Sequence, residues 1–483
     1  MSQHKTLLSH IKVYSIATVL TQLITLAVAV LSRRFLGPMQ TGIWAFFQVV
    51  LTYASFSAFG ITNASTREIP FYIGKKDYAK ADQIKNTVFT YATLSSLIVA
   101  AGIVAYALFR RGSLSGELFY GYLFVALIVV LQRLNDLLIS LLRAYKQFET
   151  ASKQMIYSSI FNAAAVTILA YSFKLFGYIT AIALSLIYNI AYMRGCHKTP
   201  LKISWSGGIL KEAAVYGFPL MILSSLTSIF LSIDKLMITK YLGFHALGLY
   251  GVATLTTEYL TKIPNSINTV LVPNFHEKYG EREKNEDLEN YLIKTADAYA
   301  VVLSLITAFA WFFAPVAIQW FLPAFTDSIP AVKILSLCIF FKAQTGNYQN
   351  FMIAIKKQGL LFPIIGSCCL AAYLLNRVAI NMGYGLQGIA AATTITVIFH
   401  YLLVYGVVQI RYLNRKSLLR SAVSSGLKFS VMVFYLLTVE YYVQGNIQFM
   451  TSVAAYSIFF GLYLPWTLKF LKEFRQKKSL SAA

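Results

Sequence analysis

The sequence predicts an all-α polytopic membrane protein with about fourteen transmembrane helices, and three observations support this prediction. The 483 residues are 57% hydrophobic and only 13% charged, whereas a soluble domain carries about 25% charge. The apolar residues form blocks of about 20, the helix length that spans a hydrocarbon core of about 30 Å. The blocks are continuous, whereas a transmembrane β-barrel would show shorter segments of alternating polarity.

Fourteen apolar blocks follow one another along the chain, separated by short charged stretches. The first block is longer than the apolar part of a usual signal peptide. Arg33 and Arg34 follow it where a small-residue cleavage site is expected, so we predict a retained span. The predicted spans are residues 12–32, 43–62, 87–109, 118–142, 155–173, 178–194, 215–239, 247–272, 296–320, 329–355, 360–383, 385–409, 422–443 and 447–471.

The distribution of basic residues predicts the orientation of these spans. An even number of spans puts both termini on one side, and the loops and tails of that side hold 29 of the 42 Lys and Arg residues. Cytoplasmic loops are enriched in Lys and Arg, so both termini are predicted to be cytoplasmic. The net charge of +23 therefore indicates orientation and attraction to anionic lipid head groups rather than nucleic-acid binding.

A short motif occurs twice and divides the chain. Residues 34–44 read RFLGPMQTGIW and residues 240–250 read KYLGFHALGLY, each between the first and second spans of a six-span set. The first glycine suits a C-terminal helix cap and the second a tight re-entry. Two parallel six-helix bundles related by an axis along the membrane normal are therefore predicted. The predicted divisions are a bundle at 1–200, a cytoplasmic linker or amphipathic segment at 201–214, a bundle at 215–412, and two further helices with a basic tail at 413–483.

At these motifs the chain resembles a known family. Residues 31–77, residues 216–250 with Pro219, and residues 385–409 are similar to Wzx-type flippases, which move O-antigen and related repeat units. Their superfamily also contains MATE-type multidrug exporters and lipid II flippases. The resemblance implies two six-helix bundles around a central cavity, alternating access often driven by an ion gradient, and two helices beyond twelve.

Charged side chains within the predicted spans mark the candidate sites, because each costs about 2.5–3.5 kcal/mol to insert. The cations outnumber the anions by seven to four, which suits an anionic cargo whose phosphate oxygens bind Lys and Arg. The cations are Arg133, Lys235, Lys262, Lys333, Lys342, Arg377 and Lys428, and the anions are Asp136, Asp234, Glu258 and Glu440.

Two sets of roles are assigned among these residues. The predicted substrate-binding residues are Lys262, Lys235, Arg133, Lys342 and Arg377. The predicted ion-coupling residues are Glu258, Asp234 and Asp136. Glu258 and Lys262 are four residues apart on one helix face, where Lys262 could meet the pyrophosphate while Glu258 titrates. The alternative is an ion pair that only stabilises the bundle.

The other charged positions carry the same two interpretations. Asp234 and Lys235 are adjacent and point in different directions, so each is expected to reach another span. Arg133 and Asp136 are three residues apart and can pair, or they can extend to the membrane surface.

Two further sets complete the candidates. Lys342, with the nearby Gln344, Asn347 and Asn350, would line an aqueous cavity or form bonds between helices. Lys333 and Lys428 are expected to extend from span ends to the interface.

The function expected from these features is the transport of a polyprenyl-pyrophosphate-linked oligosaccharide, with undecaprenyl as the carrier, for O-antigen, capsule or exopolysaccharide. The expected location is a bacterial or archaeal cytoplasmic membrane, and the expected partners are membrane lipids and a complex with a polymerase or ligase. A lipid II flippase and a MATE-type antiporter are the alternatives. An enzyme is disfavoured because the predicted external loops are short and no catalytic cluster stands at one face. The spacing of the four cysteines predicts neither a metal site nor a disulfide framework, and no cofactor is expected.

Overall fold

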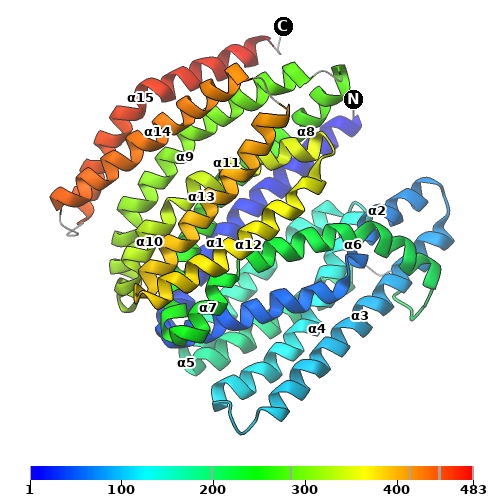
Figure 1. Ribbon diagram of the computed structural model, residues 1–483. Helices are drawn as coiled ribbons and strands as arrows, with labels where there is room; N and C mark the ends of the chain where they lie inside the picture. Colours follow the sequence, from blue (N-terminus) through cyan, green and yellow to red (C-terminus); the bar gives the residue numbers. More distant parts are fainter. Residues whose placement is uncertain (1, 197–199, 283–284, 413–414, 444–447, 481–483) are drawn as a thin grey trace. The chain divides into compact units, whose positions relative to one another are not determined.

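The computed structural model describes residues 2–196, 200–282, 285–412, 415–443 and 448–480, and all regular structure in these ranges is helical (Figure 1). The helices are α1 (Ser2–Ser55), η1 (Phe56–Ala58), α2 (Ile61–Gly74), α3 (Tyr78–Phe109), α4 (Gly116–Ala144), α5 (Phe148–Cys196), α6 (Gly207–Phe230), α7 (Ile233–Tyr241), α8 (Gly243–Arg282), α9 (Asn285–Phe321), η2 (Pro323–Ser328), α10 (Ile329–Ser336), α11 (Cys338–Ala354), η3 (Gln358–Leu360), α12 (Leu361–Asn381), α13 (Gly385–Tyr412), α14 (Arg415–Val443) and α15 (Phe449–Leu480).

The helices confirm the predicted all-α membrane fold. Within the described ranges, eleven helical segments are long and apolar enough to cross a membrane. Phe148–Cys196 contains two predicted spans and Thr18–Ala58 contains most of two, in each case separated by a non-helical residue. The predicted eighth span, 247–272, lies inside α8.

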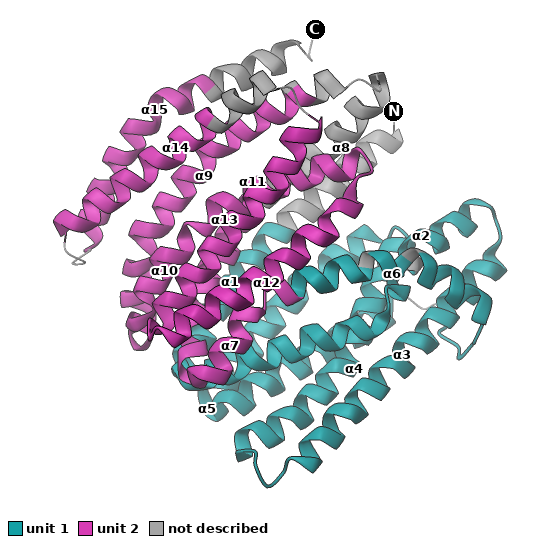
Figure 2. Ribbon diagram, in the orientation of Figure 1, with its two compact units in different colours: residues 1–228 teal, residues 229–483 magenta. Residues whose placement is uncertain are grey.

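The chain forms two compact units, residues 1–228 and 229–483 (Figure 2). The first unit contains α1 to α5 and nearly all of α6, and the second contains α7 to α15. Helices α14 and α15, which follow the predicted repeat, belong to the second unit.

The first glycine of each repeated motif has a positive φ, as its predicted place at a helix end requires. Gly37 breaks α1 with φ 70° and ψ 176°, a combination essentially restricted to glycine, and Gly243 has φ 83° at the start of α8. The second glycines, Gly42 and Gly248, are instead buried inside the following helical stretches. The turn therefore depends on the first glycine, and the predicted tight re-entry at the second is wrong.

The break in α5 is supported by a side chain from the first motif. Lys174 has φ 52° and ψ −126°, which interrupts the helical hydrogen bonds. The Leu175 N–H donates instead to Gln40 Oε1 at 3.1 Å, and Gln40 Nε2 donates to Glu117 Oε1 at 3.2 Å. A buried backbone N–H without a partner is costly, so Gln40 stabilises the hairpin between the fifth and sixth predicted spans.

The corner between α1 and α2 is held by two close contacts within the first unit. Phe59 and Gly60 are left-handed there, with φ 45° and 72°. A Cβ built on Gly217 of α6 would lie 2.4 Å from the Gly60 carbonyl oxygen, closer than real Cβ contacts. The ring of Phe59 also stacks on that of Phe218, with centroids 6.4 Å apart. Helix α6, at whose end the two units meet in sequence, is thus packed backbone to backbone against this corner.

Helices α14 and α15 pack on α9 through an aromatic core. Phe312, Phe459 and Tyr463 are almost fully buried in this cluster together with Met432 and Leu436. Figure 1 shows the three helices side by side in the second unit. This packing makes α14 and α15 part of the second unit's core.

The Gly60–Gly217 contact makes a prediction for stability. Gly217→Ala should lower the free energy of unfolding by about 1–3 kcal/mol, because the new methyl group must displace a backbone carbonyl. Thermal unfolding of the purified protein would measure this. Gly208→Ala is the matched control in the same helix, since no atom lies within 4 Å of the added Cβ. Equal melting temperatures for the two variants would contradict the tight contact.

Candidate functional site

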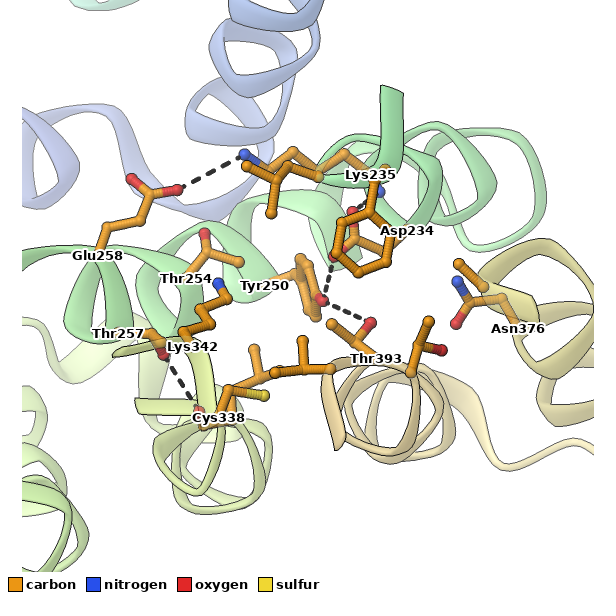
Figure 3. A pocket seen from close by; sticks show the side chains of 16 residues that line it. Asp234, Lys235, Tyr250, Thr254, Thr257, Glu258, Cys338, Lys342, Asn376 and Thr393 are labelled. Atoms are coloured by element: carbon orange, nitrogen blue, oxygen red, sulfur yellow. Dashed lines mark hydrogen bonds and ion pairs between the residues drawn. The ribbon is translucent and has the colours of Figure 1, made fainter. Parts of the chain in front are cut away.

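A cavity of about 100 Å³ lies inside the second unit (Figure 3). Helices α7, α8, α11, α12 and α13 supply most of its walls. The lining residues are Phe230, Leu231, Asp234, Lys235, Tyr250, Thr254, Thr257, Glu258, Leu335, Cys338, Lys342, Ala372, Asn376, Thr393, Thr396 and Val397. An engineered apolar cavity of about 150 Å³ holds one benzene molecule. This cavity therefore suits an ion with water, or one phosphate group, and is too small for a sugar ring.

Asp234 is the buried carboxylate of the cavity. Its side chain is 7% exposed, and its Oδ2 accepts a 2.5 Å hydrogen bond from the hydroxyl of the fully buried Tyr250. Its Oδ1 accepts the backbone N–H of Lys235 at 2.7 Å. The Tyr250 hydroxyl also lies 3.2 Å from Thr393 Oγ1, which joins α7, α8 and α13 in one chain of hydrogen bonds.

Lys235 and Glu258 form a more open pair on the same cavity. The Lys235 ammonium lies 3.8 Å from Glu258 Oε1, and the two side chains are 26% and 58% exposed. Lys235 thus reaches α8 rather than its neighbour Asp234. At this separation the pair gains little beyond its Coulomb attraction, so either group remains accessible to a ligand.

Lys342 and Asn376 bring unsatisfied polar groups to the cavity. Within the described ranges, no hydrogen bond or ion pair involves the Lys342 ammonium, which lies on the Thr254 side of Tyr250 in Figure 3. On the opposite side lies Asn376, which is 1% exposed and whose Oδ1 has no partner among the described groups. A buried amide oxygen without a partner costs about 1–3 kcal/mol, so the cavity is suited to a ligand that satisfies it.

The cavity is lined by equal numbers of cations and carboxylates, whereas the sequence predicted an excess of cations within the spans. The cations Lys235 and Lys342 face the carboxylates Asp234 and Glu258. The sequence count also omitted Asp297, which lies within the predicted ninth span. The count also left out Lys12, Arg194 and Lys469 at the ends of predicted spans, so the predicted spans hold ten cations and five anions.

Two predicted site residues of the second unit do not line the cavity. The Lys262 ammonium lies 3.9 Å from the centroid of the Tyr259 ring, one turn earlier on α8. The Arg377 guanidinium lies 5.0 Å from the centroid of the Tyr241 ring. Both are held in cation–π contacts, which are an alternative means of stabilising a cation away from water. Their role in substrate binding stays a prediction.

Arg133 and Asp136 belong to the first unit, where Arg133 supports the corner after α1. The Arg133 Nη2 donates to the carbonyl oxygens of Ser55 at 2.9 Å and Ala54 at 3.4 Å, and to Ser57 Oγ at 3.2 Å. These carbonyls end a helix and have lost their helical partners. No described ion pair joins Arg133 to Asp136, whose side chain is exposed. Their predicted transport roles stay predictions beside this structural one.

Lys333 and Lys428 are a correction to the sequence analysis, which expected both to extend to the interface. Lys333 on α10 is 8% exposed, and its ammonium lies 2.6 and 2.7 Å from the two carboxylate oxygens of Glu440 on α14. Lys428 on α14 is 3% exposed and pairs with Asp297 on α9. Both lysines stay buried because a carboxylate on a neighbouring helix meets them, which the sequence spacing did not reveal.

Tyr250, Asn376 and Thr393 are cavity residues that the sequence analysis missed. The repeat held a signal for one of them, because Tyr250 is the final aromatic residue of the second motif. Its counterpart in the first motif, Trp44, is also buried and packs edge-on against Tyr178. The hydroxyl of Tyr250 lies at a buried motif position, sixteen residues after the buried Asp234. This spacing could have indicated the hydrogen bond between Tyr250 and Asp234.

The described residues contain no group of three or more His, Cys, Asp and Glu side chains that could hold a metal ion. All four cysteines are free, and Cys338 lines the cavity with its Sγ 3.3 Å from Thr394 Oγ1. The cavity can therefore supply one buried carboxylate, hydroxyls, an amide oxygen and ammonium groups, a set that suits a proton, a monovalent cation or an anion.

Comparisons with known proteins place the chain among transporter folds. A family model described as "Polysaccharide biosynthesis protein" matches residues 7–278. An inward-facing multidrug resistance MATE family transporter of the MOP superfamily has a TM-score of 0.69 at 18% identity, over 83% of this chain and 96% of that one. The outward-facing structure has a TM-score of 0.61 at 18% identity, over 83% and 95%.

A further structure is a MOP superfamily transporter from Pyrococcus furiosus, described as having a binding pocket of reverse polarity that suggests a different function. It has a TM-score of 0.59 at 17% identity, over 86% of this chain and 96% of that one. No curated protein compared with the chain matches it. At these identities the likeness shows the MATE-like fold, and the family match covers more than half of the chain.

The Lys333–Glu440 pair yields a prediction for stability. Lys333→Met should lower the free energy of unfolding by about 1–3 kcal/mol, because it leaves the Glu440 carboxylate, which is 31% exposed, without its cation. The double variant Lys333→Met, Glu440→Gln should recover much of this loss, since it removes both charges. Thermal unfolding of the three proteins measures the coupling. Additive losses would show that the two side chains do not interact.

Proposed function

Because the chain belongs to the polysaccharide biosynthesis protein family, we propose that it moves an oligosaccharide repeat unit, linked to a polyprenyl pyrophosphate, across the cytoplasmic membrane. The family match is the observation that carries this proposal. The multi-pass helical fold, shared with MATE transporters, supports transport over a polymerase or ligase reaction. The unit would serve surface polysaccharide such as O-antigen, capsule or exopolysaccharide, beside the polymerase or ligase that uses it. The basic loops support cytoplasmic termini.

The rival functions are lipid II flipping and export of organic cations. A cavity that binds an organic cation should be net acidic, whereas the cavity of the second unit has two ammonium groups and two carboxylates. This balance disfavours the cation exporter. It does not distinguish an oligosaccharide carrier from lipid II, both of which carry a pyrophosphate, and the match to a polysaccharide biosynthesis family supports the oligosaccharide.

The size of the cavity supports a role for it in ion coupling. At about 100 Å³ it cannot hold the oligosaccharide, but it can hold the ion whose gradient drives transport. Asp234 is suited to this role, because a buried carboxylate with hydroxyl partners gains stability from a proton or a monovalent cation. The unsatisfied Oδ1 of Asn376 supplies a further oxygen ligand. Lys342 would then bind a phosphate of the carrier or compete with the ion for Asp234.

Deletion of the gene in the source organism tests the proposed transport. Carrier-linked repeat units should accumulate in the inner leaflet, where they can be extracted and quantified. Wild type and Lys240→Met should restore surface polysaccharide, while Lys342→Met should restore less than about a tenth, a loss equal to about 1.4 kcal/mol in the limiting step. Lys240 is the control because it is an exposed lysine that does not line the cavity. Normal carrier pools after deletion would overturn the proposal.

The coupling role of Asp234 is tested by the matched variants Asp234→Asn and Asp327→Asn. Asp327 is exposed and lies outside the cavity. In proteoliposomes, transport of the carrier-linked unit should respond to an imposed proton or sodium gradient in wild type and Asp327→Asn. In Asp234→Asn the gradient response should disappear while the protein keeps its melting temperature. A gradient response that survives in Asp234→Asn would remove Asp234 from the coupling step.

A further inference from the structure

We propose that residues 200–206, which connect α5 to α6, lie in the membrane–water interface and contact lipid head groups through Ile203 and Trp205. The segment has no helical structure. Ile203 is 88% exposed and Trp205 is 59% exposed, so two large apolar side chains point away from the protein. We call the segment of residues 200–206 the linker strap.

Helix α3 holds the linker strap at a defined depth. The Lys202 N–H donates to Asn86 Oδ1 at 3.1 Å, and the Ser204 N–H donates to Thr90 Oγ1 at 3.0 Å. Asn86 and Thr90 are one turn apart on α3, and the apolar span predicted in that helix begins at residue 87. The linker strap therefore runs along α3 at the start of its apolar span, which is the depth of the interface.

The same two hydrogen bonds also supply acceptors for non-helical backbone N–H groups at the edge of the hydrocarbon. Backbone N–H groups without partners are tolerated poorly where water is scarce. Asn86 and Thr90 supply side-chain acceptors for two of them, and Leu201 packs against the core of the first unit. The linker strap is thus fixed from the protein side, and Ile203 and Trp205 are its large apolar side chains that remain exposed.

The chemistry of the linker strap fits lipid as its partner. Tryptophan is enriched where membrane meets water, because its ring is apolar and its N–H is polar. Residues 194–212 contain four Lys and Arg residues and one Glu, and exposed Lys202 and Lys211 flank the apolar pair. Basic residues near a membrane surface attract anionic head groups. Two apolar side chains flanked by lysines are therefore better suited to a layer of lipid head groups than to bulk water.

Tryptophan fluorescence tests this placement with the full chain. Wild type and Trp205→Phe are reconstituted in bilayers of phosphatidylethanolamine and phosphatidylglycerol, and the difference in their emission gives the Trp205 component. Lipids brominated near the head group should quench this component at least about twofold more than lipids brominated near the chain end. Aqueous iodide should quench it weakly.

Trp311→Phe provides the matched control, because Trp311 is 6% exposed inside the second unit and its component should respond to neither quencher. If iodide quenches the Trp205 component strongly and brominated lipids do not, the side chain faces water and the proposal is overturned. Because these bilayers contain no other protein, that result would indicate that the exposed side chains form a docking surface for one. The test does not depend on which substrate the protein transports.

Discussion

The scarcity of water in a hydrocarbon environment is the constraint on which the rest of this structure depends. A polar group there must find its partner within the protein, since an unsatisfied backbone group or an unpaired charge is costly. The chain meets this requirement in several ways. Lys333 and Lys428 are each paired with a carboxylate on another helix, and Arg133 binds the carbonyls freed at the end of α1. Asn376 Oδ1 is one of several buried polar atoms without a partner among the described groups, and it lines the same cavity as Lys342, whose ammonium makes no described ion pair.

The two repeated motifs show how one backbone solution can serve different chemistry. In each copy a glycine with positive φ turns the chain, and the final aromatic residue is buried in the following helical stretch. Trp44 meets the ring of Tyr178 in the first unit, whereas Tyr250 directs its hydroxyl to Asp234 in the second. The tyrosine hydroxyl thus meets a buried carboxylate, whereas the tryptophan packs against another ring. The two motifs thus share a glycine turn, and their final aromatic residues differ in the group that they direct to a neighbour.

The fold could be predicted from the sequence because span length and apolar composition are local properties. Residue 37 was identified correctly as a turn position for the same reason, since only glycine tolerates its backbone angles. The site was predicted in part. Asp234, Lys235, Glu258 and Lys342 were identified from the cost of burying charge, and the structure brings these four to one cavity. Asn376 and Thr393 were missed because neutral polar residues are common in membrane helices, and only their place opposite Tyr250 distinguishes them. The partners of Lys333 and Lys428 lie 107 and 131 residues away, a separation at which periodicity carries no information.

The two buried ion pairs of α14 have a mechanical consequence. Lys428 and Glu440 are twelve residues apart on this helix, about 18 Å along its axis. Lys428 pairs with Asp297 on α9, and Glu440 pairs with Lys333 on α10. A helix pinned at two levels can neither roll about its axis nor slip by a turn without opening both pairs. A rearrangement of the second unit that keeps both pairs closed must therefore move α14 together with the paired positions of α9 and α10.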